Sequence, residues 1–337
     1  MWLEEEGLTV TRIAVDAFGG DYAPEQIVEG ALQAAELDGI SIVLTGDEAR
    51  LKSLVSGKAG SNRIEIVHAP EVIQMDEAPV DAVRKKTESS LVKAAHLVKD
   101  GQADALVSAG STGATMAASL FVIRRIKGVE RPAITTLMPT RTGVALVVDA
   151  GANVDCRPNQ LVQFAQMGSI YASEVLKVHN PRVGLLNIGH EPGKGNQLVQ
   201  EVYPLLQAAP INFVGNAEGR DIPRGDIDVL VCDGFVGNVV LKFAEGLGDA
   251  LFGMMKEEFT RTVSSQIGAL LLKPGLKRIK KRVDYTEYGG APLLGVNGVV
   301  IIAHGGSNAK AIYNAIRVAK EGVEQQIVQT IAERMAT

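Results

Sequence analysis

The chain has 337 residues, long enough to bury a large core as one α/β domain or as two lobes that share a cleft. Apolar residues make up 46% of it and aromatic residues only 4%, a composition that favours an aliphatic α/β enzyme over a β-sandwich. The formal net charge of −5 argues against a general nucleic-acid-binding protein.

The cysteines, the histidines and the apolar runs narrow the class further. Cys156 and Cys232 form no CxxC motif, which indicates a reducing compartment without a disulfide framework. The five histidines show no ligand spacing, so we predict neither a metal nor another cofactor. The start, MWLEEEGLTV, does not resemble a signal peptide, and no apolar run is long enough to span a membrane. These features predict a soluble, cytoplasmic protein.

Strand-like apolar runs alternate with amphipathic stretches from residue 11 onward. Strands are expected at residues 11–15, 40–45, 64–68, 105–108, 132–138, 143–149, 182–188, 212–216, 229–232 and 299–303. Helices are expected from residue 24, over 47–55, after the Ser89-Ser90 cap, over 158–178 and 247–259, and around 312–323, with residues 70–86 irregular. The alternation predicts an α/β fold with a mostly parallel sheet and one polar carboxyl edge. The short turn between 132–138 and 143–149 predicts an antiparallel addition.

The domain organisation is expected to be simple. We predict an N-terminal extension over residues 1–11 and a single α/β domain over residues 12–337. A helical, basic segment at about residues 247–285 is expected to protrude from it.

Residues 185–196, LLNIGHEPGKGN, combine the end of a strand with three glycines and one lysine. Gly189, Gly193 and Gly195 would allow close approach to a ligand, and Lys194 would supply a charge for a phosphate or a developing oxyanion. The spacing is not that of a Walker loop, and no Ser or Thr follows for magnesium. For this loop alone, an ordinary connection with a solvated lysine is the simpler interpretation. A site is favoured because similar loops follow other strands.

The run SAGSTGA at residues 108–114 is one of those loops. It places two hydroxyls and successive backbone N–H groups at a helix start, which suits an anion. Its GxxG pattern is not the GxGxxG of a dinucleotide site. Asp16 and Asp21 bracket Gly19-Gly20 and would either orient a substrate or cap a turn. Cys232 is interpreted as a buried strand thiol rather than a nucleophile, because no histidine lies near it in sequence.

Taken together, these loops resemble the bacterial acyl-carrier-protein:phosphate acyltransferase family of phospholipid synthesis. The resemblance runs from residue 13 to about residue 305, over IAVDAFGGDYAP, QMDEAPVDAVRKK, SAGSTGA, DAGANVDCRP, LLNIGHEPGKGN, FVGNAEGRDI, VCDGFVGNVVLK and YGGAPLLGVNGVVIIAHG. The departures are small: Phe18 and Tyr22 replace the more usual Met and Asn, and Ser111 replaces an Asn.

The resemblance implies a reaction, a fold and partners. A long-chain acyl group would pass from acyl-carrier protein to inorganic phosphate, and the acyl phosphate would feed a glycerol-3-phosphate acyltransferase downstream. The fold would be a three-layer α/β/α, Rossmann-like fold similar to phosphotransacetylases and isopropylmalate dehydrogenases, in a homodimer. Attack of phosphate on a thioester needs anion binding, orientation and a charge for the oxyanion, while the thiolate leaves readily. The reaction needs neither a nucleophilic residue nor a metal.

The predicted site gathers the polar residues of these loops. We predict catalytic roles for Lys194, Asn187, Asp233 and Asn238, with Lys194 stabilising the oxyanion or the phosphate. The predicted phosphate- and substrate-binding residues are Asp16, Gly19, Gly20, Ser108, Gly110, Ser111, Thr112, Gly113, Gly189, Gly195, Asn196, Asn216, Glu218, Gly234 and His304. Residues 108–113 and 189–196 would hold the phosphate. The residues that would orient the acyl thioester are Asn216, Glu218, Asp233 and Asn238, and Asp16 with His304 would complete the cleft.

A basic run follows an apolar stretch late in the chain. Residues 273–282 contain six Lys or Arg and no acidic residue, directly after three leucines at 270–272. We expect peripheral docking to an anionic membrane surface, to the acidic carrier protein or to both, through Leu271, Lys273, Lys277, Arg278, Lys280 and Lys281. Pro274-Gly275 is expected to break this segment. The alternative is a solvated helix whose apolar face packs on the core or on a dimer partner.

Two rival functions remain at this stage. One is an NAD-dependent decarboxylating dehydrogenase on the same fold, although GxGxxG and an acidic metal cluster are absent from the sequence. The other is a non-catalytic, membrane-attached scaffold or regulator.

Overall fold

The computed structural model describes residues 10–37, 39–283 and 287–336, without the side chains of residues 280, 281 and 283. The strands are β1 (Thr11–Asp16), β2 (Ile40–Gly46), β3 (Ile64–His68), β4 (Ala105–Ser108), β5 (Ala133–Pro139), β6 (Val144–Val148), β7 (Val183–Asn187), β8 (Phe213–Glu218), β9 (Val229–Val231), β10 (Ala291–Leu294) and β11 (Val299–Ile302). The helices are α1 (Glu25–Ala35), α2 (Glu48–Val55), α3 (Pro79–Lys85), α4 (Ser90–Lys99), α5 (Thr112–Ala118), α6 (Pro158–Glu174), α7 (Gln197–Ala208), α8 (Gly234–Arg261), α9 (Val263–Val283), α10 (Ala309–Glu324) and α11 (Ile327–Met335). A π-helical turn, Ser119–Ile123, extends α5, and 3₁₀ turns cover Ser61–Arg63 and Gly219–Asp221.

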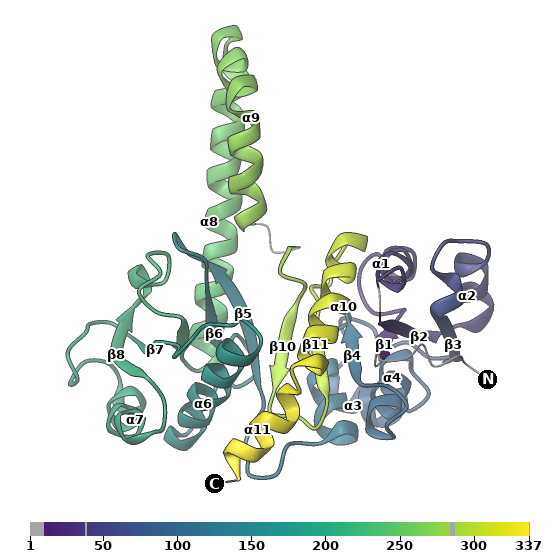
Figure 1. Cartoon of the computed structure of the whole chain (residues 1–337), viewed down its shortest axis with the longest axis horizontal. Helices are drawn as coiled ribbons and strands as arrows, with labels where there is room; N and C mark the ends of the chain where they lie inside the picture. Colours follow the sequence, from purple (N-terminus) through teal and green to yellow (C-terminus); the bar gives the residue numbers. More distant parts are fainter. Residues whose placement is uncertain (1–9, 38, 284–286, 337) are drawn as a thin grey trace.

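The strands form a single sheet in the order β3-β2-β1-β4-β11-β10-β5-β6-β9-β7-β8 (Figure 1). The first strand set, β3-β2-β1-β4-β11, is parallel throughout, and so is the second strand set, β6-β9-β7-β8. Between them, β10 runs antiparallel to β11 and β5, and β5 runs antiparallel to β6. The two sets therefore run in opposite directions. The expected antiparallel pair is present as β5 and β6.

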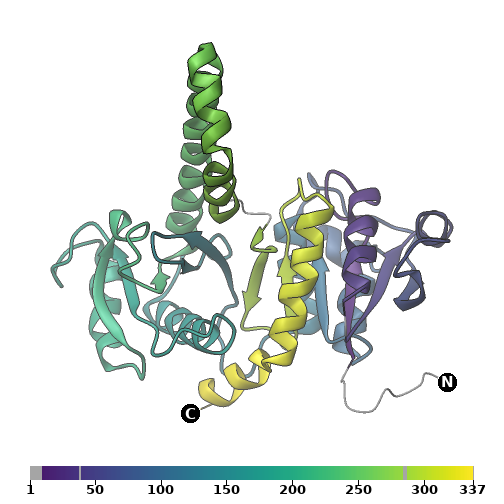
Figure 2. The ribbon, with the colours of Figure 1, turned by 45° about the horizontal axis from the view of Figure 1, so that its top comes forward.

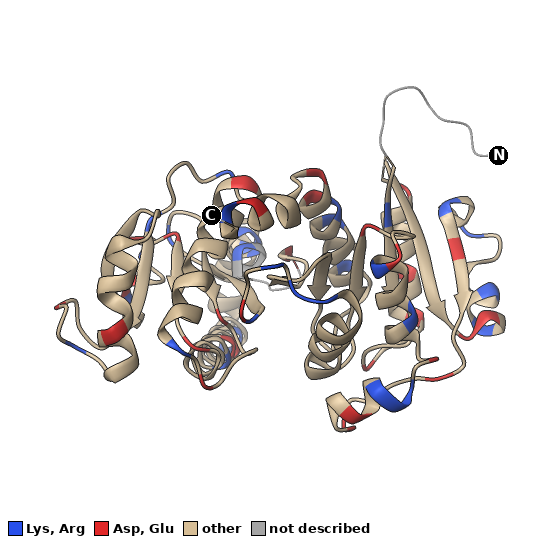
Figure 3. Cartoon of the chain, turned by 90° about the horizontal axis from the view of Figure 1, so that it is seen from below, with Lys and Arg blue, Asp and Glu red and all other residues tan. Residues whose placement is uncertain are grey.

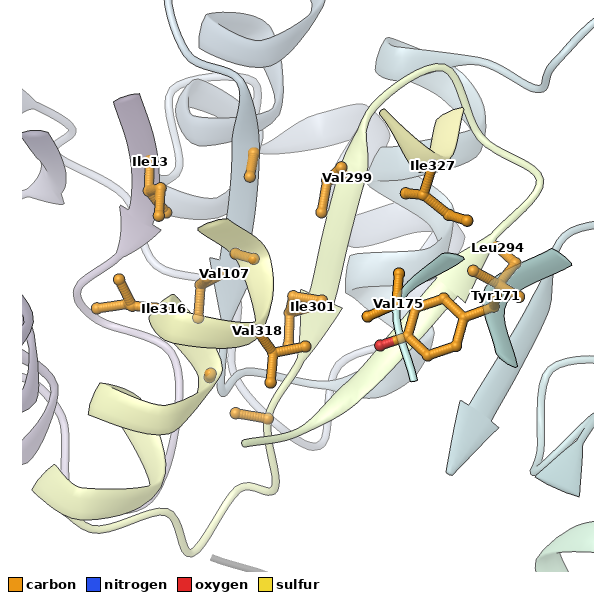
Figure 4. Packing of buried hydrophobic residues seen from close by; sticks show 14 of the residues in the cluster. Ile13, Val107, Tyr171, Val175, Leu294, Val299, Ile301, Ile316, Val318 and Ile327 are labelled. Atoms are coloured by element: carbon orange, nitrogen blue, oxygen red, sulfur yellow. The ribbon is translucent and has the colours of Figure 1, made fainter. Parts of the chain in front are cut away.

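Both faces of the sheet are apolar, because side chains alternate along each strand. In β1, Ile13 and Val15 face one layer of helices and Ala14 faces the other. Figure 4 shows the first layer, where Val107 and Ile301 of neighbouring strands meet Ile316 of α10. Full burial of each such aliphatic side chain contributes about 1.5–3 kcal/mol, so this layer stabilises the sheet from one side.

Helices cover both faces and give the expected three layers. α1, α2, α6, α7, α10 and α11 pack on one face, where they share a single core. On the other face, α3, α4, α5 and the π-helical turn cover the first strand set, and the start of α8 covers the second. The predicted α/β/α architecture with a mostly parallel sheet is confirmed.

α8 and α9 form a long hairpin that projects from the body, side by side in both views (Figures 1 and 2). The segment expected at about residues 247–285 thus belongs to a hairpin whose first helix begins at Gly234. The expected break at Pro274-Gly275 is wrong, because α9 continues through Pro274 to Val283. Among the described residues, no helix is long and apolar enough to cross a membrane.

Other elements also differ from expectation. Residues 70–86 are not wholly irregular, because α3 begins at Pro79, a residue whose fixed φ suits the first helical position. The short strand β10 was not predicted. The last helix is divided at Gln326, whose φ of +50° ends α10 and precedes α11. The extension was predicted over residues 1–11. Residues 1–9 lie outside the described residues, and Thr11 already belongs to β1.

Candidate active site

The polar loops lie at two edges of the sheet rather than one. Strands of the first set end at what we call the first carboxyl edge, after β1, β4 and β11. Strands of the second set end at the second carboxyl edge, after β6, β9, β7 and β8. Because the two sets run in opposite directions, their carboxyl ends lie at opposite ends of the strands, not on opposite faces of the sheet. The sequence predicts one shared edge, and it misses this division because strand direction is not visible in hydrophobic patterns.

A buried hydrogen-bond network underlies the first carboxyl edge. Asp16 ends β1, is only 2% exposed and lies beside Ser108, which ends β4. The hydroxyl of Ser108 donates to Oδ2 of Asp16 over 2.8 Å, and the N–H of Gly110 donates to that hydroxyl oxygen over 3.1 Å. Oδ1 of Asp16 is buried and has no hydrogen-bond partner of normal geometry among the residues that the structure describes. Asp16 therefore fixes the start of the SAGST loop through the hydroxyl of Ser108.

Glycines bring three loops together above this network. A Cβ on Gly19 would lie 2.5 Å from Oδ2 of Asp16 and 2.7 Å from the nitrogen of Gly110. Gly20, with φ of +112°, packs on the carbonyls of Ala109 and Gly305, where any Cβ would lie 3.1 Å from both oxygens. Loops 16–21, 108–113 and 304–307 therefore form one compact surface that only glycine allows.

The start of α5 completes this surface. The hydroxyl of Ser111 accepts the N–H of Ala114 over 3.4 Å and so caps the helix, while Thr112 is exposed beside it. Gly113 faces elsewhere: a Cβ there would lie 2.7 Å from Cγ of Pro79 in α3. His304 is exposed, and its Nδ1 accepts the N–H of Gly306 over 3.1 Å. Eight predicted residues thus lie at this edge, namely Asp16, Gly19, Gly20, Ser108, Gly110, Ser111, Thr112 and His304, whereas Gly113 serves packing.

Burial raises the pKa of Asp16, because loss of hydration disfavours the charged carboxylate. The hydroxyls of Ser90 and Ser108 and the N–H groups of Phe18 and Gly19 oppose that shift without cancelling it. A carboxyl held in this way retains its proton to higher pH than an exposed aspartate.

At the second carboxyl edge, Asn187 holds the glycine-rich loop in place. Its amide nitrogen donates to the carbonyl of Lys194 over 3.0 Å, and its oxygen accepts the N–H of Ile188 over 2.8 Å. Gly195, with φ of +93°, packs so closely that a Cβ would lie 2.5 Å from that oxygen. Asn196 caps α7 by accepting the N–H of Val199. Asn187 and Asn196 thus have structural bonds, and the side chain of Lys194 is exposed.

Gly189 and the residues of β8 support the same loop. A Cβ on Gly189 would lie 2.8 Å from Oε2 of Glu191. The side-chain amide of Asn216 donates to the backbone carbonyl of Glu191 over 2.8 Å, and the side-chain oxygen Oδ1 of Asn216 is buried without a partner among the described residues. Glu218 pairs with Arg220 over 2.6 Å. The loop is therefore tied to β8 rather than free.

His190 and Asp221 form a contact that the sequence analysis missed. Nε2 of His190 lies 2.8 Å from Oδ2 of Asp221, which also accepts the N–H of Glu218. Burial tends to raise the pKa of Asp221, but the hydrogen bond from His190 and the N–H of Glu218 outweigh it, so the pKa is lowered. Pairs of this kind join loops distant in sequence, and no spacing rule predicts them.

Asp233 and Gly234 lie at the start of α8. Asp233 caps the helix by accepting the N–H of Val236 over 2.9 Å. A Cβ on Gly234 would lie 2.8 Å from the nitrogen and the oxygen of Asn153, so this glycine serves close packing. Asn238 is exposed one turn further along.

Asp149 organises the second edge and was not predicted. It is fully buried and accepts hydrogen bonds from the N–H groups of Ile134, Gly151, Ala152 and Asn153. Burial raises its pKa against those bonds. Its position, an aspartate directly after a buried strand and before a glycine loop, matches that of Asp16 and was the available signal.

Cys232 is 4% exposed, and burial raises the pKa of its thiol well above the usual value. This agrees with its interpretation as a structural thiol. Among the described residues, no three His, Cys, Asp or Glu side chains are grouped to hold a metal ion.

No described hydrogen bond or ion pair joins Lys194 or Asn187 to Asp16 or Ser108. The predicted site residues therefore form two separate groups. The first edge brings together hydroxyls, backbone N–H groups and a buried carboxyl, and the second offers an exposed lysine among capping residues.

The predicted docking residues lie on α9. Leu271 is 77% exposed, and Lys273, Lys277 and Arg278 are exposed as well. The side chains of Lys280 and Lys281 are outside those that the structure describes. The apolar face of α8 does not pack on the core of its own chain: Leu247, Leu251 and Met254 are 46%, 48% and 54% exposed.

Comparison with protein families gives a match over residues 11–330 to the family described as fatty acid synthesis protein. The chain is 58% identical over 325 residues to a phosphate acyltransferase of Desulfitobacterium hafniense, covering 96% of this chain and 97% of that one. It is 56% identical to a phosphate acyltransferase of Pelotomaculum thermopropionicum, with 95% and 94% covered.

Solved structures agree in fold. A phosphotransacetylase from Streptococcus pyogenes superposes with a TM-score of 0.67 at 18% identity, covering 94% of each chain. A 4-hydroxythreonine-4-phosphate dehydrogenase from Klebsiella pneumoniae gives 0.54 at 11% identity, covering 96% of this chain and 100% of that one. At such identities the likeness concerns the fold alone. The match of the family model and the identity to curated relatives place the chain in the fatty acid synthesis protein family.

Proposed function

We propose that this protein transfers the acyl group of a long-chain acyl-[acyl-carrier protein] to inorganic phosphate, which gives acyl phosphate and free carrier protein. The family and the relatives make the chain an acyltransferase; the acyl donor and the acceptor belong to the proposal. The acyl phosphate would then serve a glycerol-3-phosphate acyltransferase.

The observation that carries the proposal is the Asp16–Ser108–Gly110 network beneath the glycine loops of the first carboxyl edge. It fixes N–H groups and hydroxyls on one compact surface. Preorganised donors of this kind suit a phosphate dianion and the oxyanion that forms when it attacks. We place inorganic phosphate here.

The chemistry requires few groups. An oxygen of hydrogen phosphate attacks the thioester carbonyl carbon, the C–S bond breaks, and its electron pair leaves with sulfur. The proton of the attacking phosphate ends on the thiolate, which is a good leaving group because its conjugate acid has a pKa near about 8.5. We assign the oxyanion to the N–H groups and hydroxyls of the first edge. A part for Lys194, whose exposed ammonium lies at the second edge, would require the acyl thioester to reach both edges, and mutation of Lys194 tests this.

We also propose that the α8–α9 hairpin docks the protein to other surfaces. Its apolar side chains are exposed along the projecting part, and its second helix is basic. Lys and Arg are interspersed with Asp and Glu over the side of the molecule drawn in Figure 3, so the basic run of α9 is a local feature. The hairpin would provide the contacts for three associations: peripheral attachment to an anionic membrane, docking of the carrier protein and formation of a homodimer.

The experiment is free-thiol release from palmitoyl-carrier protein, measured with and without inorganic phosphate. Phosphate-dependent release together with hydroxylamine-trappable acyl phosphate supports the proposal. Phosphate-independent release would identify a thioesterase, and no release with any acyl chain would favour the scaffold alternative.

A further inference from the structure

A cavity of about 560 Å³ opens beside the second carboxyl edge and contains none of the residues assigned above to the substrate. Its walls are the connection that precedes β5, the residues that lead into α6 and the first turn of α6. Three arginines line it: Arg125, Arg131 and Arg157. They come from separate points of the chain, so the fold and not the local sequence brings them together.

Three arginines and two acids line the cavity, so the lining carries one net positive charge, and all three arginines are exposed. Within the part of the chain that the structure describes, Arg125 donates to the backbone carbonyls of Val129 and Glu130 and to no carboxylate. The side chains of Arg131 and Arg157 have no hydrogen-bond or ion-pair partner among the described residues. Among the ion pairs that the structure describes, none joins these arginines to Glu130 or to the other acid of the cavity, Asp155, although both acids line the same space.

Like charges around one cavity repel each other, and an anion between them relieves that repulsion. The N-terminus of the 17-residue helix α6 adds its positive dipole end to the same wall. A guanidinium group can bind two oxygens of one phosphate with two parallel N–H donors. A chloride ion has no second acceptor atom, so phosphate is the better match.

The size and the acids of the cavity define the ligand further. Small-molecule sites usually measure about 300–1,000 Å³, so inorganic phosphate alone would leave most of this space empty. The carboxylates of Glu130 and Asp155 accept hydrogen bonds from hydroxyl groups. We propose that this cavity binds a small phosphate monoester that carries hydroxyl groups.

Cys156 lines the cavity and gives a readout specific to it. The only other cysteine, Cys232, is 4% exposed. Burial and the carboxylates of Asp149 and Asp233 raise the pKa of Cys156 to about 12, so labelling is slow and its rate is easily followed. The thiol is labelled with methyl methanethiosulfonate and the modified fraction is read by intact mass. Glycerol 3-phosphate is the probe, and potassium chloride of equal ionic strength is the blank.

We expect glycerol 3-phosphate at about 5 mM to slow labelling of the wild type about tenfold, the factor for a ligand at ten times its Kd. The double variant Arg131→Gln/Arg157→Gln should lose this protection. Lys127→Gln is the matched control, because Lys127 is exposed on the same connection but does not line the cavity. It should be protected as the wild type is. If the double variant does not fold, the two single variants replace it, each with reduced protection.

Three results would overturn the proposal. The first is no protection of the wild type, and the second is equal protection of the double variant. The third is equal protection by inorganic phosphate at the same concentration, which would mean that the cavity holds a free anion only. The measurement contains no acyl donor, so its outcome does not depend on the proposed acyl transfer.

Discussion

Asp16 is an aspartate that the fold keeps away from water. A group with a higher pKa in the folded protein binds more protons there than in the unfolded chain. Its contribution to stability is therefore present at low pH and is lost as the pH rises from the unfolded value toward the folded one. Each unit of pKa difference corresponds to about 1.4 kcal/mol.

We expect Asp16→Asn to gain stability relative to wild type as the pH is raised, because asparagine cannot acquire the buried charge. The difference in melting temperature, variant minus wild type, should increase as the pH is raised above about 3.9, the ordinary pKa of an aspartate, and should level off once the pH passes the higher pKa of the folded protein. Thermal melting followed by circular dichroism measures it. Asp21→Asn, an exposed carboxylate of the same loop, is the control and should show no such trend. A difference that shrinks with pH would mean that Asp16 is stabilised as an anion.

The two glycines of the SAGSTGA loop should respond differently to alanine. A Cβ on Gly110 would press on the hydroxyl of Ser108 at 3.2 Å, so we expect a higher KM for phosphate. A Cβ on Gly113 would meet Pro79 at 2.7 Å, so we expect lost stability of about 1–3 kcal/mol as α3 moves, with KM little changed. Phosphate kinetics and thermal melting of both variants measure this. The opposite pattern would place the anion at Gly113.

Lys194→Ala should lower kcat about 100- to 1,000-fold if the ammonium stabilises the oxyanion, since loss of one such interaction costs about 2.7–4 kcal/mol. The fold should persist, because the side chain is exposed. Lys127→Ala, another exposed lysine, is the control. Turnover of Lys194→Ala within about threefold of wild type, well short of that cost, would leave the chemistry to the first carboxyl edge.

Residue types alone could not distinguish side chains that bind a substrate from side chains that cap a helix. Asn196 and Asp233 follow strands and precede helices, which is where both functions place Asn and Asp. The structure gives each of them an N–H of the following helix as a partner. Asp16 and Ser108 were predictable because each is a polar residue that ends a buried strand and is followed by a glycine-containing loop. Their direct contact depends on the pairing of β1 with β4, which no local pattern contains.

At the scale of elements, the hairpin carries most of the large apolar side chains that are exposed among the described residues. Leu271 is expected to insert at a membrane surface, so Leu271→Glu should abolish co-sedimentation with vesicles that contain phosphatidylglycerol. Gln266→Glu adds the same charge to the same exposed helix without removing an apolar group, and should still bind. Binding of the wild type should weaken with salt.

The basic residues of α9 require a separate test. Lys273, Lys277 and Arg278 replaced together by Glu should raise the KM for acyl-carrier protein if that acidic partner docks here. Vesicle binding of the same variant shows whether membrane and partner share the surface. If neither quantity changes, the basic run is a solvated surface and the docking proposal fails.

Hydrophobic periodicity and capping residues predicted most helices and strands. They failed where contacts between elements outweigh the helix or strand propensity of the local sequence. α9 continues through Pro274, a residue that usually interrupts a helix, and the helix as a whole contacts α8. β10 is short and contains Pro292, so no run of alternating residues marked it. Its pairing with β11 and β5 defines it instead.

At the scale of the molecule, the exposed residues of α8 favour a second copy of the chain as their partner. Leu251 and Met254 lie on the projecting part and contact little of their own body. We expect the wild type to be a homodimer and Leu251→Glu/Met254→Glu to be a monomer, because charges on an apolar interface are costly to bury. Light scattering after gel filtration measures this. A wild-type monomer, or a double variant that remains dimeric, would exclude this interface.

The position of β11 has a consequence for synthesis on the ribosome. β11 and β10 lie between β4 and β5, yet both are translated after the whole second strand set and the hairpin. The second set is contiguous in the chain and can assemble as it emerges, whereas the earlier strands wait with the edge of β4 unpaired. An unpaired edge is a template for aggregation. A nascent chain that stops before residue 299 therefore leaves two half-sheets unjoined, and the amino-terminal half, although made first, is completed last.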